Sequence, residues 1–135
     1  MTEPASQSLS PQAGGTRRAL IVDDDQALLR LMKTWLTGIG FEVETFDRFE
    51  PAKIRLMGSA PDVLITDVRL GAFNGLQLVV LAKLANPELV AVVLTGFDDR
   101  VLRKEAADAG AVYLSKPVRA EQLIDVIQTY TSVIS

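Results

Sequence analysis

Residues 19–25 read ALIVDDD, four apolar residues followed at once by three aspartates. A short apolar run that is rich in branched residues and lacks polar alternation is typical of a strand buried on both faces of a parallel sheet. The change to three carboxylates marks the carboxyl end of that strand, and ligands bind at this edge of open α/β sheets. The stretch therefore predicts both a strand of the central sheet and part of a site.

Four other segments have the same strand character. Residues 41–46 alternate between apolar and polar side chains and indicate a strand with one wetter face. The three remaining runs are largely apolar, and they lie at residues 63–66, 89–94 and 111–114. Together with residues 19–22, these runs predict five strands, most of them buried on both faces.

Helical patterns separate the strands. The second helix follows Pro51, and the fourth begins at the possible caps Asp98 and Asp99 and extends to residue 107. The apolar residues that mark the other helices are Leu28, Met32, Trp35, Leu36 and Ile39, then Ile54 and Met57, then Leu76, Val79, Val80 and Leu84, and last Leu123, Val126, Ile127 and Tyr130. About five strand–helix units in ~120 residues predict a flavodoxin-like, doubly wound (βα)5 α/β sandwich with a five-stranded parallel sheet of order 2-1-3-4-5.

Composition narrows the class of protein. The 135 residues suit one domain, and we expect a flexible tail over residues 1–16, which are rich in Ser, Pro, Gly and Ala, and a folded domain over residues 17–135. The chain has no cysteine and no histidine, which excludes disulfides, thiolate sites and histidine chemistry within it. A net charge of −3 argues against direct nucleic-acid binding. No run approaches the ~20 apolar residues of a membrane span, and no signal peptide is evident, so a cytoplasmic location is expected.

The expected carboxyl ends of the strands carry polar groups of complementary chemistry. The first strand ends in the aspartates at 23–25 and the third in Asp67, whereas the fourth ends in Thr95 and the fifth runs into Lys116. Each pair of carboxylates ~4 Å apart would repel by ~4 kcal/mol at an effective dielectric of ~20. Lys116 offsets part of this repulsion, and Mg²⁺, which binds through few carboxylates and keeps water and phosphate oxygens, suits the rest. A carboxylate in such a setting is a plausible phosphoryl acceptor, and Asp67 is the candidate.

Four motifs in order resemble the receiver domains of two-component response regulators, over about residues 17–133. They are IVDDD at 21–25, ITD at 65–67 followed by Asn74-Gly75, LTG at 94–96, and YLSKP at 113–117. The resemblance implies a switch that catalyses its own phosphorylation and dephosphorylation and is not an enzyme acting on outside substrates. The phosphoryl donor would be a phosphohistidine on a sensor histidine kinase or a histidine phosphotransfer protein.

The resemblance also implies roles for individual residues. Asp67 resembles the phosphoacceptor and Lys116 the family's lysine, joined to Pro117 by a cis peptide bond. The metal would be held by Asp23, Asp24 and Asp67 and by the backbone carbonyl of Arg69.

Thr95 and Tyr113 resemble the pair of switch residues. Thr95 would move toward the phosphoryl group and Tyr113 would turn inward. This change would reshape the surface of the fourth helix (about 98–108), the fifth strand and the fifth helix (about 119–132), where a partner protein or a second receiver would bind.

The chain departs from the family pattern at some positions. Gly71 stands where a proline is common, which predicts a softer loop, while Asn74 still serves as a helix cap. Val118 stands where an aromatic residue is frequent. Arg69 and Phe97, two residues beyond Asp67 and Thr95, are large, and we expect them to shield the phosphoryl group from water.

Several alternatives stay open at this point. The aspartates at 23–25 could serve only as a helix start, a role expected for Asp25 in particular. Asp23-x-Asp25 also resembles the nucleophile motif of haloacid dehalogenase phosphohydrolases, although the chain is short and has no cap domain. An unphosphorylated structural adaptor is a third possibility. The chain ends at Ser135 after the fifth helix, so we expect no output domain in it, and either a stand-alone receiver or a fragment would fit.

Overall fold

The computed structural model describes residues 16–134, so nearly all of the predicted tail over residues 1–16 lies outside the described residues. Five parallel strands form one sheet in the order β3-β2-β4-β7-β8. Their bounds are Arg17–Val22 for β2, Phe41–Phe46 for β3, Val63–Asp67 for β4, Val90–Thr95 for β7 and Ala111–Ser115 for β8. Numbered along the chain, this is the predicted order 2-1-3-4-5.

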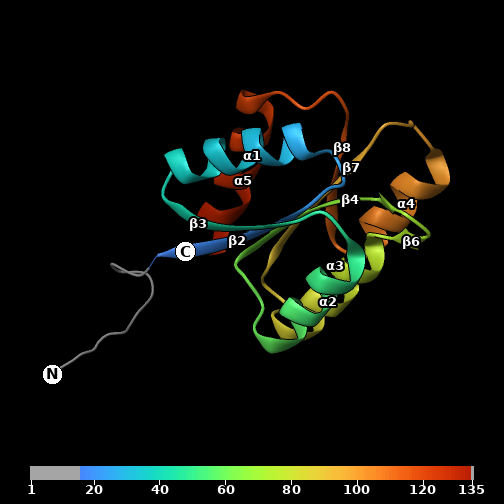
Figure 1. Ribbon diagram of the computed structural model, residues 1–135, viewed down its shortest axis with the longest axis horizontal. Coiled ribbons are helices and arrows are strands. Elements are labelled where there is room, and N and C mark those ends of the chain that lie inside the picture. The colour runs from blue at the N-terminus through green and yellow to red at the C-terminus, as the bar shows by residue number, and fades with distance from the viewer. Residues whose placement is uncertain (1–15, 135) are drawn as a thin grey trace, which may run out of the picture.

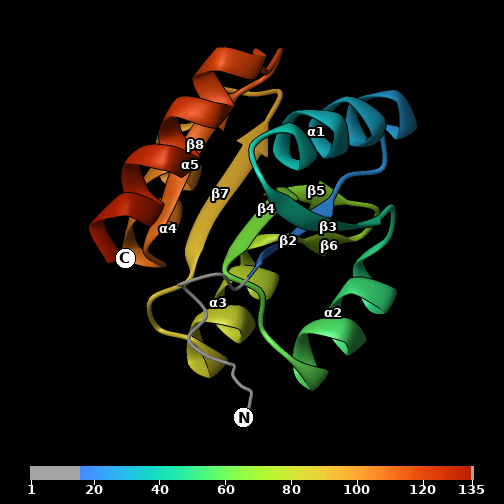
Figure 2. The same cartoon turned by 90° about the vertical axis from the view of Figure 1, so that its left-hand side faces the viewer.

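Five helices cover the two faces of the sheet (Figures 1 and 2). They are α1 (Gln26–Gly38), α2 (Phe49–Gly58), α3 (Leu76–Ala85), α4 (Arg100–Asp108) and α5 (Ala120–Ile134). α1 and α5 lie on one face, and α2, α3 and α4 lie on the other. The predicted doubly wound α/β sandwich is therefore confirmed. Among residues 16–134, no helix has both the length and the apolar character that crossing a bilayer requires.

The alternation of side chains along each strand divides the core in two. Ile21 and Ile65 face α1 and α5, while their neighbours Leu20 and Leu64 face the layer of α2 and α3. Every residue of β4 and β7 is buried, because helices cover these central strands on both sides. β3 lies at the edge and keeps Glu42 and Glu44 exposed, as its alternating sequence predicted.

Two aspartates are the N-caps of helices, as the sequence predicted. The Asp25 carboxylate accepts a hydrogen bond of 3.1 Å from the N–H of Leu28 and caps α1. The Asp99 carboxylate accepts from the N–H groups of Val101 and Leu102, at 2.9 and 3.3 Å, and caps α4. Each carboxylate satisfies N–H groups that the helix itself leaves unpaired.

The prediction of which residues form the apolar faces of α2 and α3 is partly wrong. Ile54 and Met57 mark α2 as a helix, but they are 67% and 70% exposed, and Leu84 at the end of α3 is 78% exposed. α2 begins at Phe49, two residues before Pro51, which a first helical turn tolerates. This start turns other side chains toward the sheet, namely Phe49, Ala52 and Leu56. The packing of α2 on the sheet, and not the spacing of its apolar residues alone, thus decides which of them form the core.

A small hairpin replaces the loop expected after Asp67. β5 (Arg69–Leu70) pairs antiparallel with β6 (Phe73–Asn74), and Gly71 turns between them at φ +64°. Phe73 stacks on Phe49 of α2 with ring centroids 4.5 Å apart. The Asn74 side-chain oxygen Oδ1 accepts a 2.8 Å hydrogen bond from the N–H of Leu76, the first residue of α3, but the N-cap of this helix is Gly75, so the cap predicted at Asn74 is one residue early.

Candidate functional site

Acidic side chains meet at the carboxyl end of the sheet. β2 and β4 are neighbours, and Val22 pairs with Thr66, so the next residues, Asp23 and Asp67, lie side by side. Asp23 is fully buried and Asp67 is 7% exposed. Carboxylate oxygens of Asp23, Asp24 and Asp67 all lie within 4.8 Å of one another. These three aspartates therefore lie close together, as the sequence predicted.

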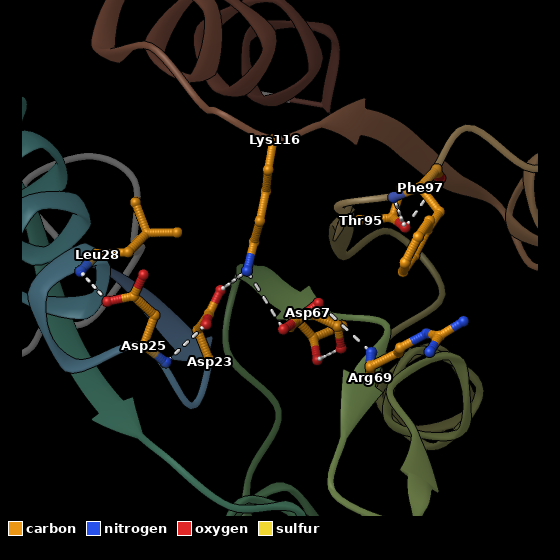
Figure 3. Close-up of polar contacts among 9 residues, drawn as sticks. Asp23, Asp25, Leu28, Asp67, Arg69, Thr95, Phe97 and Lys116 are labelled. Atoms are coloured by element: carbon orange, nitrogen blue, oxygen red, sulfur yellow. Dashed lines mark hydrogen bonds and ion pairs between the residues drawn. The ribbon is translucent and has the colours of Figure 1, made fainter.

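Lys116 joins the two buried carboxylates (Figure 3). Its Nζ lies 2.9 Å from Asp23 Oδ2 and 3.3 Å from Asp67 Oδ2. The residue follows β8, and its backbone N–H donates to the carbonyl of Thr95 at 2.8 Å. The Lys116–Pro117 peptide bond is cis, as the resemblance implied. One ammonium group is thus shared by two carboxylates that would otherwise repel each other.

The acidic cluster fits a hard divalent cation. Asp23 Oδ1 accepts a hydrogen bond of 2.9 Å from the N–H of Asp25, but the buried Oδ2 accepts none from residues 16–134 and is met only by the Lys116 charge. Three carboxylates against one ammonium leave an excess of negative charge and unfilled oxygen lone pairs. Oxygen-only donors of this kind suit Mg²⁺ or a similar ion. The carbonyl of Arg69, predicted as a further ligand, belongs to β5, which begins two residues after Asp67.

Burial and charge move the pKa values of this cluster. Burial raises the pKa of Asp67 and the neighbouring Asp23 charge raises it further, while Lys116 and the N–H of Arg69, 3.4 Å from Asp67 Oδ1, act in the opposite direction. Burial lowers the pKa of Lys116, but the carboxylates of Asp23 and Asp67 outweigh it, so the net pKa is raised. Lys116 therefore stays charged, and the Asp67 carboxylate is less stable as an anion than it is in water.

Gly75 lets β4 and α3 approach closely, a role that the sequence analysis missed. A Cβ atom on this residue would lie 2.0 Å from the carbonyl oxygen of Asp67 and 2.7 Å from Thr66 Oγ1. The N–H of Gly75 also donates to the carbonyl of Val68 at 2.7 Å. The only signal in the sequence was the absence of a side chain after Asn74, which a helix start would also explain.

The two predicted switch residues share one hydrogen-bond acceptor. The Thr95 hydroxyl donates to the Phe97 carbonyl at 3.0 Å and accepts from the Phe97 N–H at 3.1 Å. The Tyr113 hydroxyl donates to the same carbonyl at 2.8 Å and accepts from the N–H of Asp99 at 3.3 Å. Thr95 thus lies at the carboxyl end of the sheet, as Asp67 does, but its hydroxyl is hydrogen-bonded to the backbone of Phe97 (Figure 3). The backbone of Phe97 is the link that sequence reasoning did not find.

The two large residues expected to shield the site contact each other. The Arg69 guanidinium carbon lies 4.7 Å from the centroid of the Phe97 ring, a cation–π geometry. In Figure 3 the two side chains face each other beside Asp67. They come from β5 and from the segment between β7 and α4, so the contact bridges two loops at the site.

The position of Asp25 argues against the dehalogenase reading. Its carboxylate caps α1 and points away from the Lys116 ammonium (Figure 3). Asp23-x-Asp25 therefore does not supply two carboxylates to one site. The acidic group that faces Asp23 comes instead from β4, as Asp67.

Comparisons with known proteins agree with this geometry. A family model described as the response regulator receiver domain matches residues 19–128. RegA, the photosynthetic apparatus regulatory protein of Rhodobacter capsulatus, is 32% identical over 86% of this chain and 64% of its own length. The DNA-binding transcriptional regulator NtrC of Klebsiella pneumoniae is 31% identical over 81% of this chain and 24% of its own length. The chain thus spans 64% of the length of RegA but only 24% of that of NtrC.

Solved structures show the same fold. A CheY-like response regulator receiver domain protein from Methanospirillum hungatei superposes with a TM-score of 0.79 at 28% identity, covering 84% of this chain and 92% of that one. A response regulator receiver protein from Sinorhizobium medicae gives 0.75 at 28% identity, covering 85% and 94%. With its sheet order, its acidic cluster and these matches, the chain belongs to the family of response regulator receiver domains.

Proposed function

We propose that Asp67 accepts a phosphoryl group and that the domain is a two-component or phosphorelay switch. The observation that carries the proposal is the position of Lys116, whose ammonium lies between Asp23 and Asp67 at the carboxyl end of the sheet. Phosphoryl transfer needs mainly positioning and neutralisation of charge, and this arrangement supplies both.

In the proposed reaction, a carboxylate oxygen of Asp67 bonds to the phosphorus of a partner phosphohistidine. The P–N bond breaks, and its electron pair stays on the imidazole of the donor. After the transfer, the Lys116 ammonium would pair with a phosphoryl oxygen, whereas before it paired with the Asp67 carboxylate. Hydrolysis of the acyl phosphate later returns the free carboxylate, so the domain promotes both its phosphorylation and its dephosphorylation.

Asp23, Asp24, Asp67 and the Arg69 carbonyl are the groups that would hold Mg²⁺. The ion would supply positive charge to the phosphoryl oxygens when it is bound. The buried Oδ2 atom of Asp23 accepts no hydrogen bond from the described residues and could bind the ion. Asp24 is exposed and gives the cluster its one solvent-facing carboxylate.

The switch would pass from Thr95 to the surface formed by α4, β8 and α5. To reach a phosphoryl group, the Thr95 hydroxyl would leave the Phe97 carbonyl, which also holds Tyr113. Release of Tyr113 would then change the α4–β8–α5 surface. We propose that a downstream protein or a second receiver binds there, that a histidine kinase or phosphotransfer protein is the donor, and that the domain works in the cytoplasm without direct contact to nucleic acid or membrane.

The test is labelling with a small phosphodonor. Incubation with Mg²⁺ and acetyl phosphate should raise the intact mass by one phosphoryl group, and removal of Mg²⁺ with a chelator should prevent the gain. Asp67→Asn should abolish labelling, whereas Asp62→Asn, at a carboxylate bonded to the backbone of Arg18 far from the site, should not. Labelling that persists in Asp67→Asn, or sustained turnover of phosphate esters, would contradict the proposal.

A further inference from the structure

The β5–β6 hairpin, which carries the Arg69 carbonyl proposed as a metal ligand, is too short to keep its shape alone. Its strands pair through two residues each. The turn between them is made by Gly71, at a φ of +64°, and glycine has the freest backbone of all residues. An isolated two-stranded hairpin is at best marginally stable in water. The shape of this hairpin therefore depends on what it packs against.

One face of the hairpin is attached to α2. Leu70 and Phe73 are partners across the two strands, so their side chains lie on the same face. Leu70 is buried in the same core cluster as Phe49, the first residue of α2. The Phe73 ring, although Phe73 is 45% exposed, stacks on the Phe49 ring, with centroids 4.5 Å apart and 7° between the planes. The stack thus joins the hairpin to a buried side chain of the core.

The other face of the hairpin belongs to the site. Arg69 precedes Leu70 in β5, so its side chain points the opposite way, and its guanidinium lies against the Phe97 ring. The N–H of Arg69 lies 3.4 Å from Asp67 Oδ1, to which it donates. A shift of the hairpin would therefore move the backbone of Arg69 relative to the acidic cluster.

We propose that Phe73 is a positioning residue, whose stack on Phe49 holds the hairpin so that the backbone carbonyl of Arg69 is in place for the divalent cation. The inference rests on the proposed function, since it concerns the affinity of that site for its metal. Phe73 is uncharged and lies on the face that packs against α2, so it acts through the backbone of the hairpin. Without the stack, the hairpin would populate other arrangements, and the fraction of molecules competent to bind the ion would fall.

The experiment measures Mg²⁺ affinity and amide hydrogen exchange, both followed by NMR. Stacking of two aromatic rings has a strength that corresponds to about 2- to 10-fold in an equilibrium, so Phe73→Ala should bind Mg²⁺ about 2- to 10-fold more weakly than the wild type. In the metal-free protein, exchange of the amides of residues 69–74 should accelerate by a larger factor than exchange of the amides of β2 and β4. Phe73→Tyr, which keeps the ring, should restore both quantities.

Tyr130→Ala is the matched control. Tyr130 is an aromatic residue of similar exposure, but it lies beside Val90, at the amino end of the sheet and away from the site. Its replacement should leave both the Mg²⁺ affinity and the exchange of residues 69–74 unchanged. If Phe73→Ala is too unstable to titrate, Phe73→Leu, which keeps an apolar side chain without a ring, gives the same test.

A double-mutant cycle tests whether Phe73 acts through Phe49. Phe49→Leu should also weaken Mg²⁺ binding, and adding Phe73→Ala to it should cause little further loss, because the stack is already absent. Unchanged Mg²⁺ affinity in Phe73→Ala, additive losses in the double variant, or an equal loss in Tyr130→Ala overturns the inference. Failure of the wild type to bind Mg²⁺ would instead overturn the proposed function.

Discussion

The two halves of the site are held in different ways. In the acidic half, Asp23 and Asp67 are buried and share the Lys116 ammonium, so ion pairing within the site holds it. In the switch half, the hydroxyls of Thr95 and Tyr113 both bond to the Phe97 carbonyl and make no bond to Asp23 or Asp67 in the described structure.

The difference assigns a separate task to each half. The acidic half brings together carboxylates whose repulsion Lys116 offsets only in part, which suits the proposed binding of a cation. The hydroxyls of the switch half form neutral hydrogen bonds that can be exchanged at small cost, which suits the movement proposed for them. The following predictions test this division, beginning with the largest expected effect.

Replacement of Lys116 should damage the acidic half most. Lys116→Met removes the only ammonium that contacts Asp23 and Asp67 in the described structure, and breaking a buried ion pair costs about 3–5 kcal/mol of the free energy of unfolding. Urea unfolding at neutral pH without divalent ions measures the loss. Lys104→Met is the matched control, because its pair with Asp108 is exposed and should contribute less than about 0.5 kcal/mol. Equal losses in the two variants would contradict the division.

A methyl group on Gly75 should displace the acceptor. In Gly75→Ala the new Cβ would lie 2.0 Å from the carbonyl oxygen of Asp67, and relieving this clash should cost about 1–3 kcal/mol of stability and slow the labelling of Asp67. Gly58→Ala at the end of α2 meets no atom within 4 Å and should be neutral. If Gly75→Ala matches Gly58→Ala in urea unfolding and in labelling rate, the tight approach of α3 does not position the acceptor.

Removal of the Asp67 charge should stabilise the free protein. The folded state raises the pKa of Asp67 above 3.8, so its ionisation lowers stability as the pH rises through the raised pKa. Asp67→Asn should therefore be more stable than the wild type at neutral pH without divalent ions, by about 1–2 kcal/mol.

The pH and metal dependence of that difference provide the check. The greater stability of Asp67→Asn should shrink as the pH falls toward 3.8, because the Asp67 carboxyl of the folded wild type then becomes protonated and is uncharged, like the asparagine. Mg²⁺ at neutral pH should also shrink it, because the ion offsets the charge that the variant lacks. A constant difference across pH and Mg²⁺ concentration, measured by thermal unfolding, would show that charge is not its cause.

The contact between Arg69 and Phe97 should have the smallest effect. If these side chains shield the phosphoryl group, replacing both with alanine should speed dephosphorylation of labelled Asp67 by a few-fold, on the order of the cation–π energy. The measurement is the decay of the labelled mass after the phosphodonor is removed. Val101→Ala, at another exposed apolar side chain nearby on α4, is the control. An unchanged lifetime in the double variant would contradict shielding.

Much of the acidic half could be predicted from the sequence. Asp23 and Asp67 stand at the ends of largely apolar runs, and parallel strands bring their carboxyl ends together, so the convergence of these residues and Lys116 at one end of the sheet needed no further information. The capping roles of Asp25 and Asp99 were also predictable, because they depend on N–H groups two or three residues away in the chain.

The switch half and the helix faces could be predicted less well. The bond between Thr95 and Phe97 spans two residues, but the competing partner at Asp67 is on another strand, and only the packed structure decides between them. Ile54 and Met57 have helical spacing, yet α2 packs on the sheet through Phe49, Ala52 and Leu56 and leaves both residues exposed. The stacking of Arg103 on Tyr113 joins residues from α4 and β8 and has no local signal.

By itself, the sequence determined the sheet, its order and the edge at which the acidic residues gather, because strand periodicity and parallel crossovers act on short segments and leave few topologies. Only the tertiary structure decided that one ammonium bridges two carboxylates, that Gly75 must lack a side chain, and that both switch hydroxyls meet at Phe97. Those features depend on contacts of a few ångströms between segments far apart in the chain, and no local pattern encodes such distances.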